Sequence, residues 1–233
     1  MIRKVKKNKF SIKDSKVEEF YKKFKKVIFN NIKEQNFAIA VSGGADSLCL
    51  AYFAKIYKTE FGNKVHVLIV NHNLRKESGE EANKVKKILI NKNIDSKILN
   101  WKGKVPNKNI QSNARSIRYN LLSSYCQKNN IKFLVTAHHI DDQIENFFIR
   151  LFRGSGLTGL SSMAEVVNYD GNLKIIRPLL KLEKNNLKYV TTNYFKKYIK
   201  DPSNENEKFL RVRVRKYRKN MEQEGLDTKK IIK

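Results

Sequence analysis

Cysteine, acidic residues and long apolar runs are all scarce in this 233-residue sequence. The two cysteines, Cys49 and Cys126, stand far apart, so we predict buried, reduced thiols rather than a disulfide framework or a zinc ribbon. No apolar run approaches the roughly 18 residues of a membrane span. Residues 1–9 are basic but precede no apolar stretch, so we expect no secretory signal. These absences favour a globular protein of the cytoplasm.

The shortage of acidic residues leaves the chain strongly basic. Its 49 Lys and Arg residues face only 22 Asp and Glu residues, which gives a net charge of +27. Such a chain attracts polyanions, and phosphate contacts dominate nucleic-acid affinity. A blander interpretation is that an AT-rich genome supplies lysines as replaceable surface residues. The charge favours RNA binding but does not identify the RNA.

Short apolar segments alternate with helical ones. We expect strands at 37–41, 65–70, 96–99, 133–136 and 173–176, and helices at 17–29, 48–57, 77–91, 110–127, 141–152 and 182–198. This alternation is typical of βαβ units and predicts an α/β fold with a doubly wound, mostly parallel sheet flanked by helices. Sheets of this kind bind ligands at the carboxyl ends of their strands.

The pattern divides the chain into two parts. Residues 1–200 are predicted to form one domain with a basic N-terminal lead-in. Residues 201–233 begin with an Asp-Pro-Ser-Asn turn and continue as a basic, helical segment. We expect this segment to be the start of a further domain that the chain lacks.

The sharpest motif is Ser-Gly-Gly-Ala-Asp-Ser at residues 42–47, between an expected strand and an expected helix. Such a turn presents free backbone N–H groups and the positive end of a helix dipole to phosphates. Gly43 and Gly44 allow close approach, while Ser42 and Ser47 add hydroxyl donors. There is no Gly-Lys-Ser/Thr ending, so this is no Walker A loop.

The acidic residue of this motif needs its own explanation. The Asp46 carboxylate would repel phosphate, and it makes sense if it holds Mg²⁺ or a cationic substrate group beside the phosphates. The alternative is an ordinary glycine turn followed by a helix N-cap.

One further pair of residues points to anion binding. Arg115 and Arg118 stand three apart on one helical face, where two guanidinium groups can grip phosphates. His72 follows the second expected strand and is a candidate through the resemblance described below. The alternatives are a structural histidine at the end of a strand and a solvated basic face.

Acidic residues recur where the fourth expected strand ends. Asp141 and Glu145 stand at i and i+4 on one helical face, where they could hold an ammonium group or Mg²⁺. The alternative is helix N-terminal acids favoured by the dipole. His138 and His139 precede them without cysteine ligands, so zinc is not predicted.

The segment 42–47 resembles the SGGxDS signature of the PP-loop ATP pyrophosphatases. Within that superfamily, segments from about residue 37 to 215 resemble the tRNA(Ile)-lysidine synthetase family. The family usually has Val-Asp-His-x-Leu-Arg where Asn71 stands here, so a role needing charge at that position is in doubt. The matching segments are 70–75, 114–119, 136–145, Arg150 to Leu160, Arg177-Pro178-Leu179-Leu180, Asp201 with Ser203-Asn204, and Arg211 with Arg213.

The resemblance implies a ligase that forms a carbon–nitrogen bond. Its substrates would be ATP with Mg²⁺, free L-lysine, and tRNA(Ile) with a CAU anticodon, whose wobble cytidine is adenylated and then joined to lysine. The implied catalytic residues are Asp46, Asp141 and Glu145. The implied ATP-binding residues are Ser42, Gly43, Gly44, Ala45, Asp46, Ser47, His72, Arg115 and His138, with Asp46 also the Mg²⁺ ligand. The implied lysine- and tRNA-binding residues are Asp141, Glu145, Arg118, Arg153, Arg177, Arg211 and Arg213.

Two alternative functions stay open. A tRNA thiolase of the same superfamily usually carries cysteines near its site, whereas Cys126 has no CxxC partner. A non-catalytic RNA-binding protein on a decayed PP-loop fold would explain Asn71, but the intact segments 42–47 and 141–145 argue against decay.

Overall fold

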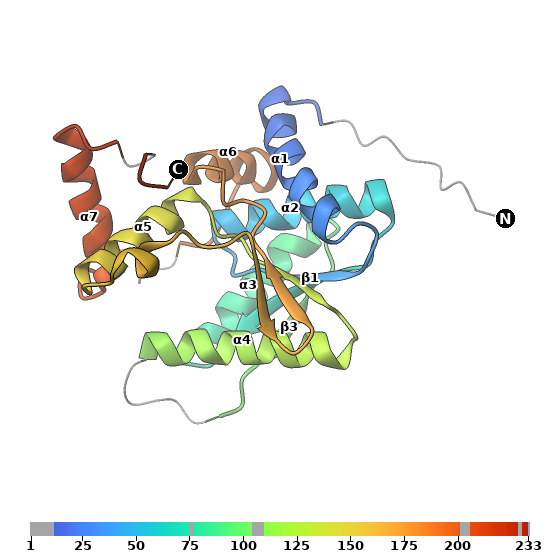
Figure 1. Cartoon of the computed structure of the whole chain (residues 1–233). Coiled ribbons are helices and arrows are strands. Elements are labelled where there is room, and N and C mark those ends of the chain that lie inside the picture. The colour runs from blue at the N-terminus through green and yellow to red at the C-terminus, as the bar shows by residue number, and fades with distance from the viewer. Residues whose placement is uncertain (1–11, 75–76, 104–109, 201–205, 228–229, 233) are drawn as a thin grey trace.

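One mixed sheet organises the chain (Figure 1). The computed structural model describes residues 12–74, 77–103, 110–200, 206–227 and 230–232. Its strand order is β3-β2-β1-β4-β6-β5, and all neighbouring pairs are parallel except β5 with β6. The strands are Phe37–Ala40 (β1), Val65–Asn71 (β2), Lys97–Asn100 (β3), Phe133–Val135 (β4), Val166–Asp170 (β5) and Leu173–Ile176 (β6). The predicted mostly parallel α/β sheet is confirmed.

Helices cover both faces of the sheet. Helices α1, α2, α3 and α6 pack on one face and α4 on the other, as Figure 1 shows. The helices are Ser15–Asn31 (α1), Ala45–Phe61 (α2), Ser78–Ile90 (α3), Ile110–Lys128 (α4), Ile140–Phe152 (α5), Lys184–Phe195 (α6) and Leu210–Gln223 (α7), with 3-10 turns at Leu157–Leu160 (η1) and Lys230–Ile232 (η3). Of the helices in the described segments, none combines the length and apolarity that a bilayer crossing requires.

The side-chain alternation of β1 explains why both faces are covered. Phe37 and Ile39 are fully buried beneath α1 and α2, whereas Ala38 lies between them in sequence and packs under α4 with Leu68 and Leu134. Successive strand residues point to opposite faces. A strand that is apolar at every position therefore needs helices on both sides.

The region after Gly154 holds a strand that the sequence did not predict. Strand β5 pairs antiparallel with β6 across a turn at Gly171, whose φ is +52°. It forms the edge of the sheet, and its second half is exposed. An edge strand with an exposed face carries little apolar patterning, which is why periodicity missed it.

The basic segment near the C-terminus forms the predicted helix, and it packs on α5. Helices α5 and α7 lie side by side in Figure 1. Ile144, Phe148 and Val214 form their small shared core. The turn predicted at 201–204 and the lead-in up to residue 11 lie outside the described residues. The predicted division into 1–200 and 201–233 stays a prediction.

Candidate active site

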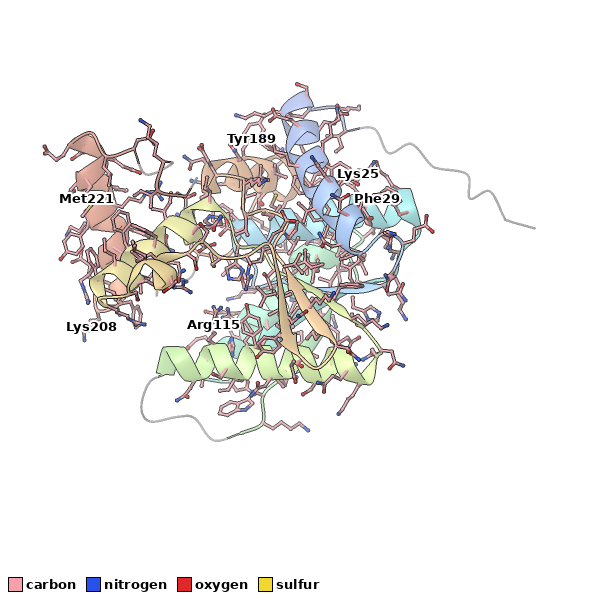
Figure 2. The ribbon with its side chains drawn as sticks, in the orientation of Figure 1. Lys25, Phe29, Arg115, Tyr189, Lys208 and Met221 are labelled. Carbon is pink, nitrogen blue, oxygen red and sulfur yellow. The ribbon has the colours of Figure 1, made fainter. Side chains whose placement is uncertain are left out.

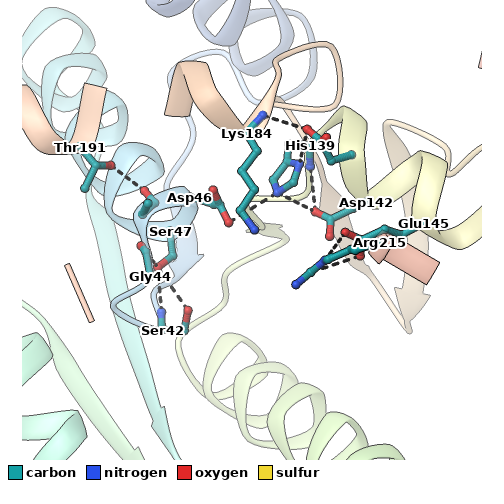
Figure 3. Close-up of polar contacts among 12 residues, drawn as sticks. Ser42, Gly44, Asp46, Ser47, His139, Asp142, Glu145, Lys184, Thr191 and Arg215 are labelled. Carbon is teal, nitrogen blue, oxygen red and sulfur yellow. Dashed lines mark hydrogen bonds and ion pairs between the residues drawn. The ribbon is translucent and has the colours of Figure 1, made fainter. Parts of the chain in front are cut away.

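The phosphate loop turns directly from β1 into α2 at the carboxyl edge of the sheet. Gly44 is the N-cap of α2, so no N-cap side chain occupies the first backbone N–H groups of that helix. The Ser47 hydroxyl shapes the turn, because its Oγ accepts from the backbone N–H groups of Ser42 and Gly43, both at 3.1 Å, and donates to the carbonyl of Gly44 at 3.0 Å (Figure 3). Ser47 was predicted as a phosphate donor, but here its proton serves the loop itself.

Close packing demands glycine at position 43. Its backbone φ is +89°, a value that residues with a side chain rarely adopt. A Cβ added at this position would lie 2.5 Å from Val85 Cγ2. Ile199 N donates to the Gly43 carbonyl at 2.9 Å, and buried Thr191 Oγ1 donates to the Ala45 carbonyl at 2.6 Å. Helix α6 and the residues after it therefore fix the backbone of the phosphate loop through these two hydrogen bonds.

His139 lies at the centre of three aspartates. Its Nε2 is 3.5 Å from Asp46 Oδ2 and 3.4 Å from Asp142 Oδ2, and its Nδ1 is 3.6 Å from Asp141 Oδ2. Asp46 belongs to the first turn of α2, whereas the other residues stand at the start of α5. The cluster thus joins the phosphate loop to the end of the neighbouring parallel strand, as Figure 3 shows.

This environment determines the charge of the buried imidazole. Burial alone would lower the pKa of His139, but the nearby carboxylates of Asp141, Asp46 and Asp142 outweigh it and raise the pKa to about 10. His139 is therefore an imidazolium at neutral pH. Burial also opposes ionisation of Asp141, yet contacts with His139, the backbone N–H of Lys184 and Arg218 hold the pKa of that carboxyl below its usual range.

Helix α7 supplies arginines to the carboxylates of α5. Glu145 is only 2% exposed, and its Oε1 and Oε2 accept from Arg215 Nε and Nη2 at 2.5 and 3.3 Å. Arg211 Nε also lies 3.3 Å from Glu145 Oε2, and Arg218 Nη1 donates to Asp141 Oδ1 at 2.7 Å. The carboxylates of α5 are thus paired with the arginines of α7 across the contact between the two helices.

Arg115 and Arg118 of α4 contact different neighbours. Arg118 Nη2 donates to His72 Nε2 at 3.4 Å, whereas the Arg115 guanidinium lies over the ring of Tyr119 at 5.0 Å. Three residues fall short of a full helical turn by about 60°, so the side chains reach different neighbours. That the two guanidinium groups grip phosphates from one helical face stays a prediction.

The histidines predicted to bind ATP are neutral at physiological pH. Burial and the charge of Arg118 lower the pKa of His72 to about 4. Burial also lowers the pKa of His138 to about 4, helped by the charges of Arg177 and Arg115 against the opposing effect of Asp142. His138 Nδ1 lies 2.9 Å from Thr136 Oγ1. Neutral imidazoles can hydrogen-bond a nucleotide but add no charge to it.

Asn71 makes contacts that use its amide. Its Nδ2 donates to Asn100 Oδ1 at 3.0 Å, while its Oδ1 accepts from Asn73 N at 3.1 Å. An aspartate cannot donate to Asn100. The amide at this position therefore has a structural partner at the end of β3.

Three predicted arginines make no contact with the carboxylates of the acidic cluster in the described part of the chain. Arg153 is exposed at the C-cap of α5, about 18 Å along the helix from Asp141 at 1.5 Å per residue. Arg213 Nη1 donates to the carbonyls of Glu207 and Lys208, at 2.8 and 3.0 Å. Arg177 is buried and donates to the Ala164 carbonyl at 2.7 Å. Arg75, Asp201, Ser203 and Asn204 lie outside the described residues.

A divalent cation fits only one corner of the site. Asp46 Oδ1 is buried and has no hydrogen-bond partner in the described part of the chain, and carboxylate oxygen is the ligand that Mg²⁺ prefers. Among residues 12–74, 77–103, 110–200, 206–227 and 230–232, no group of three or more His, Cys, Asp or Glu side chains is arranged to hold a metal. Mg²⁺ bound here would therefore depend on substrate phosphates for its other ligands.

Sequence reasoning underestimated four residues of the cluster. His139 and Asp142 stood in a quoted motif without a role, and Arg215 and Arg218 were treated as part of a basic tail. The distance along the chain between α5 and α7 hid the contact. A partial signal was available, since acidic residues in so basic a sequence need counter-charges nearby.

This chain has the arrangement of a PP-loop protein. Strand β1 leads into a glycine-rich turn that carries Asp46, and α2 begins there with its N-terminus at the edge of the sheet. The PP-loop domain family matches residues 15–220, and the chain belongs to that family. Among its relatives is a tRNA(Ile)-lysidine synthase of Orientia tsutsugamushi, 45% identical over 184 residues, which cover 79% of this chain and 41% of the relative.

Other relatives agree in name. The tRNA(Ile)-lysidine synthases of Rickettsia bellii (strain OSU 85-389) and Wolbachia pipientis wMel are 41% and 38% identical, over 84% and 83% of this chain and 46% and 45% of their own lengths. The chain spans less than half the length of these relatives. Among solved structures, the U34-tRNA thiolase NcsA from Methanococcus maripaludis, with its 4Fe-4S cluster, has the same fold at a TM-score of 0.76, with 21% identity over 93% of this chain and 76% of that one.

Proposed function

We propose that this chain joins free lysine to C2 of the wobble cytidine of tRNA(Ile) with a CAU anticodon, at the expense of ATP. One observation carries the proposal. The phosphate loop meets, through His139 and Asp46, a cluster in which carboxylates of α5 alternate with arginines of α7. Such a cluster complements lysine, which carries a carboxylate and two ammonium groups, and it stands beside the place where ATP would bind.

The first step activates the base. The cytosine O2 attacks the α-phosphate of ATP, the new P–O bond forms, and pyrophosphate leaves. Backbone N–H groups at the start of α2 would hold phosphate oxygens, aided by the helix dipole. Mg²⁺, when bound, would offset phosphate charge, and Asp46 is the ligand that this chain offers. The loop contributes mainly by positioning and charge stabilisation.

The second step forms the carbon–nitrogen bond. The ε-amino group of lysine attacks C2, the C2–O bond breaks, and AMP leaves with its oxygen. Carboxylates of the cluster would hold the ammonium groups of lysine, and the α7 arginines its carboxylate. The arrangement would hold lysine beside the adenylated base.

The ε-ammonium must lose a proton before it can attack. Of the three carboxylates predicted for this role, Asp141 and Glu145 each use both oxygens in contacts. Asp46 Oδ1 has no partner among the described residues. One oxygen cannot hold a cation and accept a proton at once, so we assign the proton to Asp46 only in this second step, after pyrophosphate has left, and a positioning role to Asp141 and Glu145.

Mass spectrometry of tRNA nucleosides tests the function directly. Incubating tRNA(Ile) with the chain, ATP and lysine is expected to yield lysidine, and omitting lysine is expected to leave pyrophosphate release without that product. Binding of tRNA without pyrophosphate release would instead support a non-catalytic RNA-binding protein.

A thiolase is the weaker alternative. A cluster of the 4Fe-4S type usually takes four cysteine ligands, and this chain has two cysteines. Both are buried. Burial raises the pKa of Cys126 to about 12, and burial with the nearby charge of Asp46 raises the pKa of Cys49 well above its usual value. Because the thiolate is the nucleophilic form and a raised pKa disfavours it, neither cysteine is activated as a nucleophile.

A further inference from the structure

A cavity of about 200 Å³ lies between α4 and the β5–β6 hairpin, apart from the acidic cluster. Two arginines, two tyrosines, one serine and two aliphatic side chains line it. Its lining residues are Arg115, Ser116, Tyr119, Val167, Tyr169, Ile175 and Arg177. The cavity adjoins the candidate active site. The backbone N–H of Thr136 donates to the carbonyl of Ile176 at 2.9 Å. Arg177 directly follows Ile176, and His138 comes two residues after Thr136, so the two side chains belong to neighbouring strand ends.

The aromatic rings of this cavity are arranged to receive a planar group. The centroids of Tyr119 and Tyr169 lie 5.2 Å apart with 33° between their planes, and Arg115 lies over Tyr119. Tyr119 is buried in the α4 core, whereas Tyr169 is 40% exposed. Exposing that much of a large aromatic ring beside a cavity leaves a stacking surface available.

The charge in the cavity calls for an anion. Arg177 is 9% exposed, and its Nε has no hydrogen-bond partner in the described part of the chain. A buried, unsatisfied guanidinium N–H costs free energy unless a ligand or water completes it. Arg115 is exposed and adds a second guanidinium at the rim, seen in Figure 2 above α4.

We infer that this cavity binds one unpaired nucleotide of the tRNA anticodon loop, a neighbour of the modified cytidine. Its base would stack on Tyr169, and its phosphate would meet Arg115 at the rim and the unpartnered Nε–H of Arg177. RNA-binding proteins recognise loop bases in this way, by stacking splayed bases on aromatic rings and guanidinium planes. The identity of the RNA rests on the proposed function, whereas the chemistry of the cavity does not.

Binding of anticodon stem–loops to the 233-residue chain tests the site. Tyr169→Ala is expected to weaken binding by about tenfold to a hundredfold, since stacking on one aromatic ring has that worth. Tyr169→Phe is expected to bind as the wild type does. Tyr189→Ala is a matched control, because Tyr189 is 38% exposed and lies on α6, far from Arg115 in Figure 2.

A series of stem–loops with one abasic nucleotide each identifies the bound base. At one loop position, removing the base should weaken binding to the wild type but not further weaken binding to Tyr169→Ala. Arg115→Ala should flatten the salt dependence by roughly 0.7 log units per log of salt, and Arg115→Lys should restore it. Losses that add at every position would overturn the subsite, as would an unchanged affinity of Tyr169→Ala.

The competing occupant is the adenine of ATP. If Tyr169→Ala weakens ATP binding and leaves stem–loop binding intact, the cavity belongs to the ATP site and the inference is wrong. Failure of the subsite is distinguishable from failure of the proposed function. A wild-type chain that makes lysidine while Tyr169→Ala binds RNA normally retains the function and loses the subsite.

Discussion

Arg215 forms a two-point ion pair with Glu145, 70 residues away in sequence, and this pair closes α7 over the buried carboxylate of α5. The side chain of Glu145 is 3% exposed and that of Arg215 is 29% exposed. A charge this buried is stable only with a counter-charge in good geometry. The placement of α7 and the chemistry of the α5 carboxylates therefore depend on each other.

The first prediction concerns Asp46. Asp46→Asn is expected to lower tRNA-dependent pyrophosphate release by at least about a hundredfold, because the variant loses the carboxylate oxygen that can hold a cation beside the phosphates. Binding of tRNA should change little. Asp95→Asn is a suitable control, since Asp95 is exposed. Wild-type turnover in Asp46→Asn would remove the carboxylate from the mechanism.

The second prediction concerns Glu145. Glu145→Gln should raise the KM for lysine by about tenfold or more while pyrophosphate release is affected less. A double-mutant cycle with Arg215→Gln should show a coupling in unfolding free energy of about 1 to 3 kcal/mol. An unchanged lysine KM and product yield would remove Glu145 from the lysine site.

Two lysine analogues separate the roles of these residues. Norleucine lacks the ε-ammonium group, and 1,5-diaminopentane lacks the carboxylate. Glu145→Gln should weaken competitive inhibition by 1,5-diaminopentane and spare norleucine, while Arg215→Gln should do the opposite. If both variants weaken both analogues equally, the pair serves only to hold the helices together.

The third prediction is a pH dependence that arises at His139. Its folded-state pKa of about 10 lies above the ordinary 6.5. Its contribution to stability is therefore complete below pH 6.5, declines as pH rises, and is absent above about pH 10. The difference in unfolding free energy between wild type and His139→Gln should shrink over that interval.

Imidazole NMR signals give an independent check. At pH 8, His139 should be protonated, while His72 and His138 should be neutral because the pKa of each is lowered to about 4. A His139 signal that titrates near pH 6.5 would contradict the three-aspartate environment.

The fourth prediction concerns RNA binding by α7 and the residues just before it. Arg215 and Arg218 point at carboxylates of α5, so we expect exposed residues nearby to make the phosphate contacts. Replacing Lys208, Lys216 and Lys219 by Gln should flatten the salt dependence of tRNA binding by roughly 2 to 3 log units per log of salt, while preference for the wobble cytidine persists.

Three exposed lysines of α1 provide the matched control. Replacing Lys22, Lys23 and Lys26 by Gln removes the same charge from another helix. If this variant flattens the slope and the α7 variant does not, the RNA surface lies on the N-terminal side of the molecule instead.

Local pattern was sufficient for most of the fold. Apolar runs such as Phe37 to Ile39 can be satisfied only between two layers, so they predicted a parallel sheet covered on both faces. The phosphate loop was also predictable, because the glycines, the preceding strand and the following helix are neighbours in sequence. Strand β5 was not, since the exposed residues of an edge strand need no apolar period.

The sequence by itself determined the residue types of the site and the edge of the sheet to which they belong. Only the tertiary structure decided which charges meet. Asp141 and Asp142 are close to His139 in sequence, but Asp46 joins them only because α2 lies beside α5, and the Glu145 carboxylate is paired with Arg215 only because α7 packs on α5. The contact of Arg118 with His72, and the meeting of Tyr119 with Tyr169 across α4 and β5, are likewise tertiary. Ion pairs and ring stacking require groups to lie within a few ångströms of each other. The number of residues between two groups in the sequence does not give their distance in the folded chain.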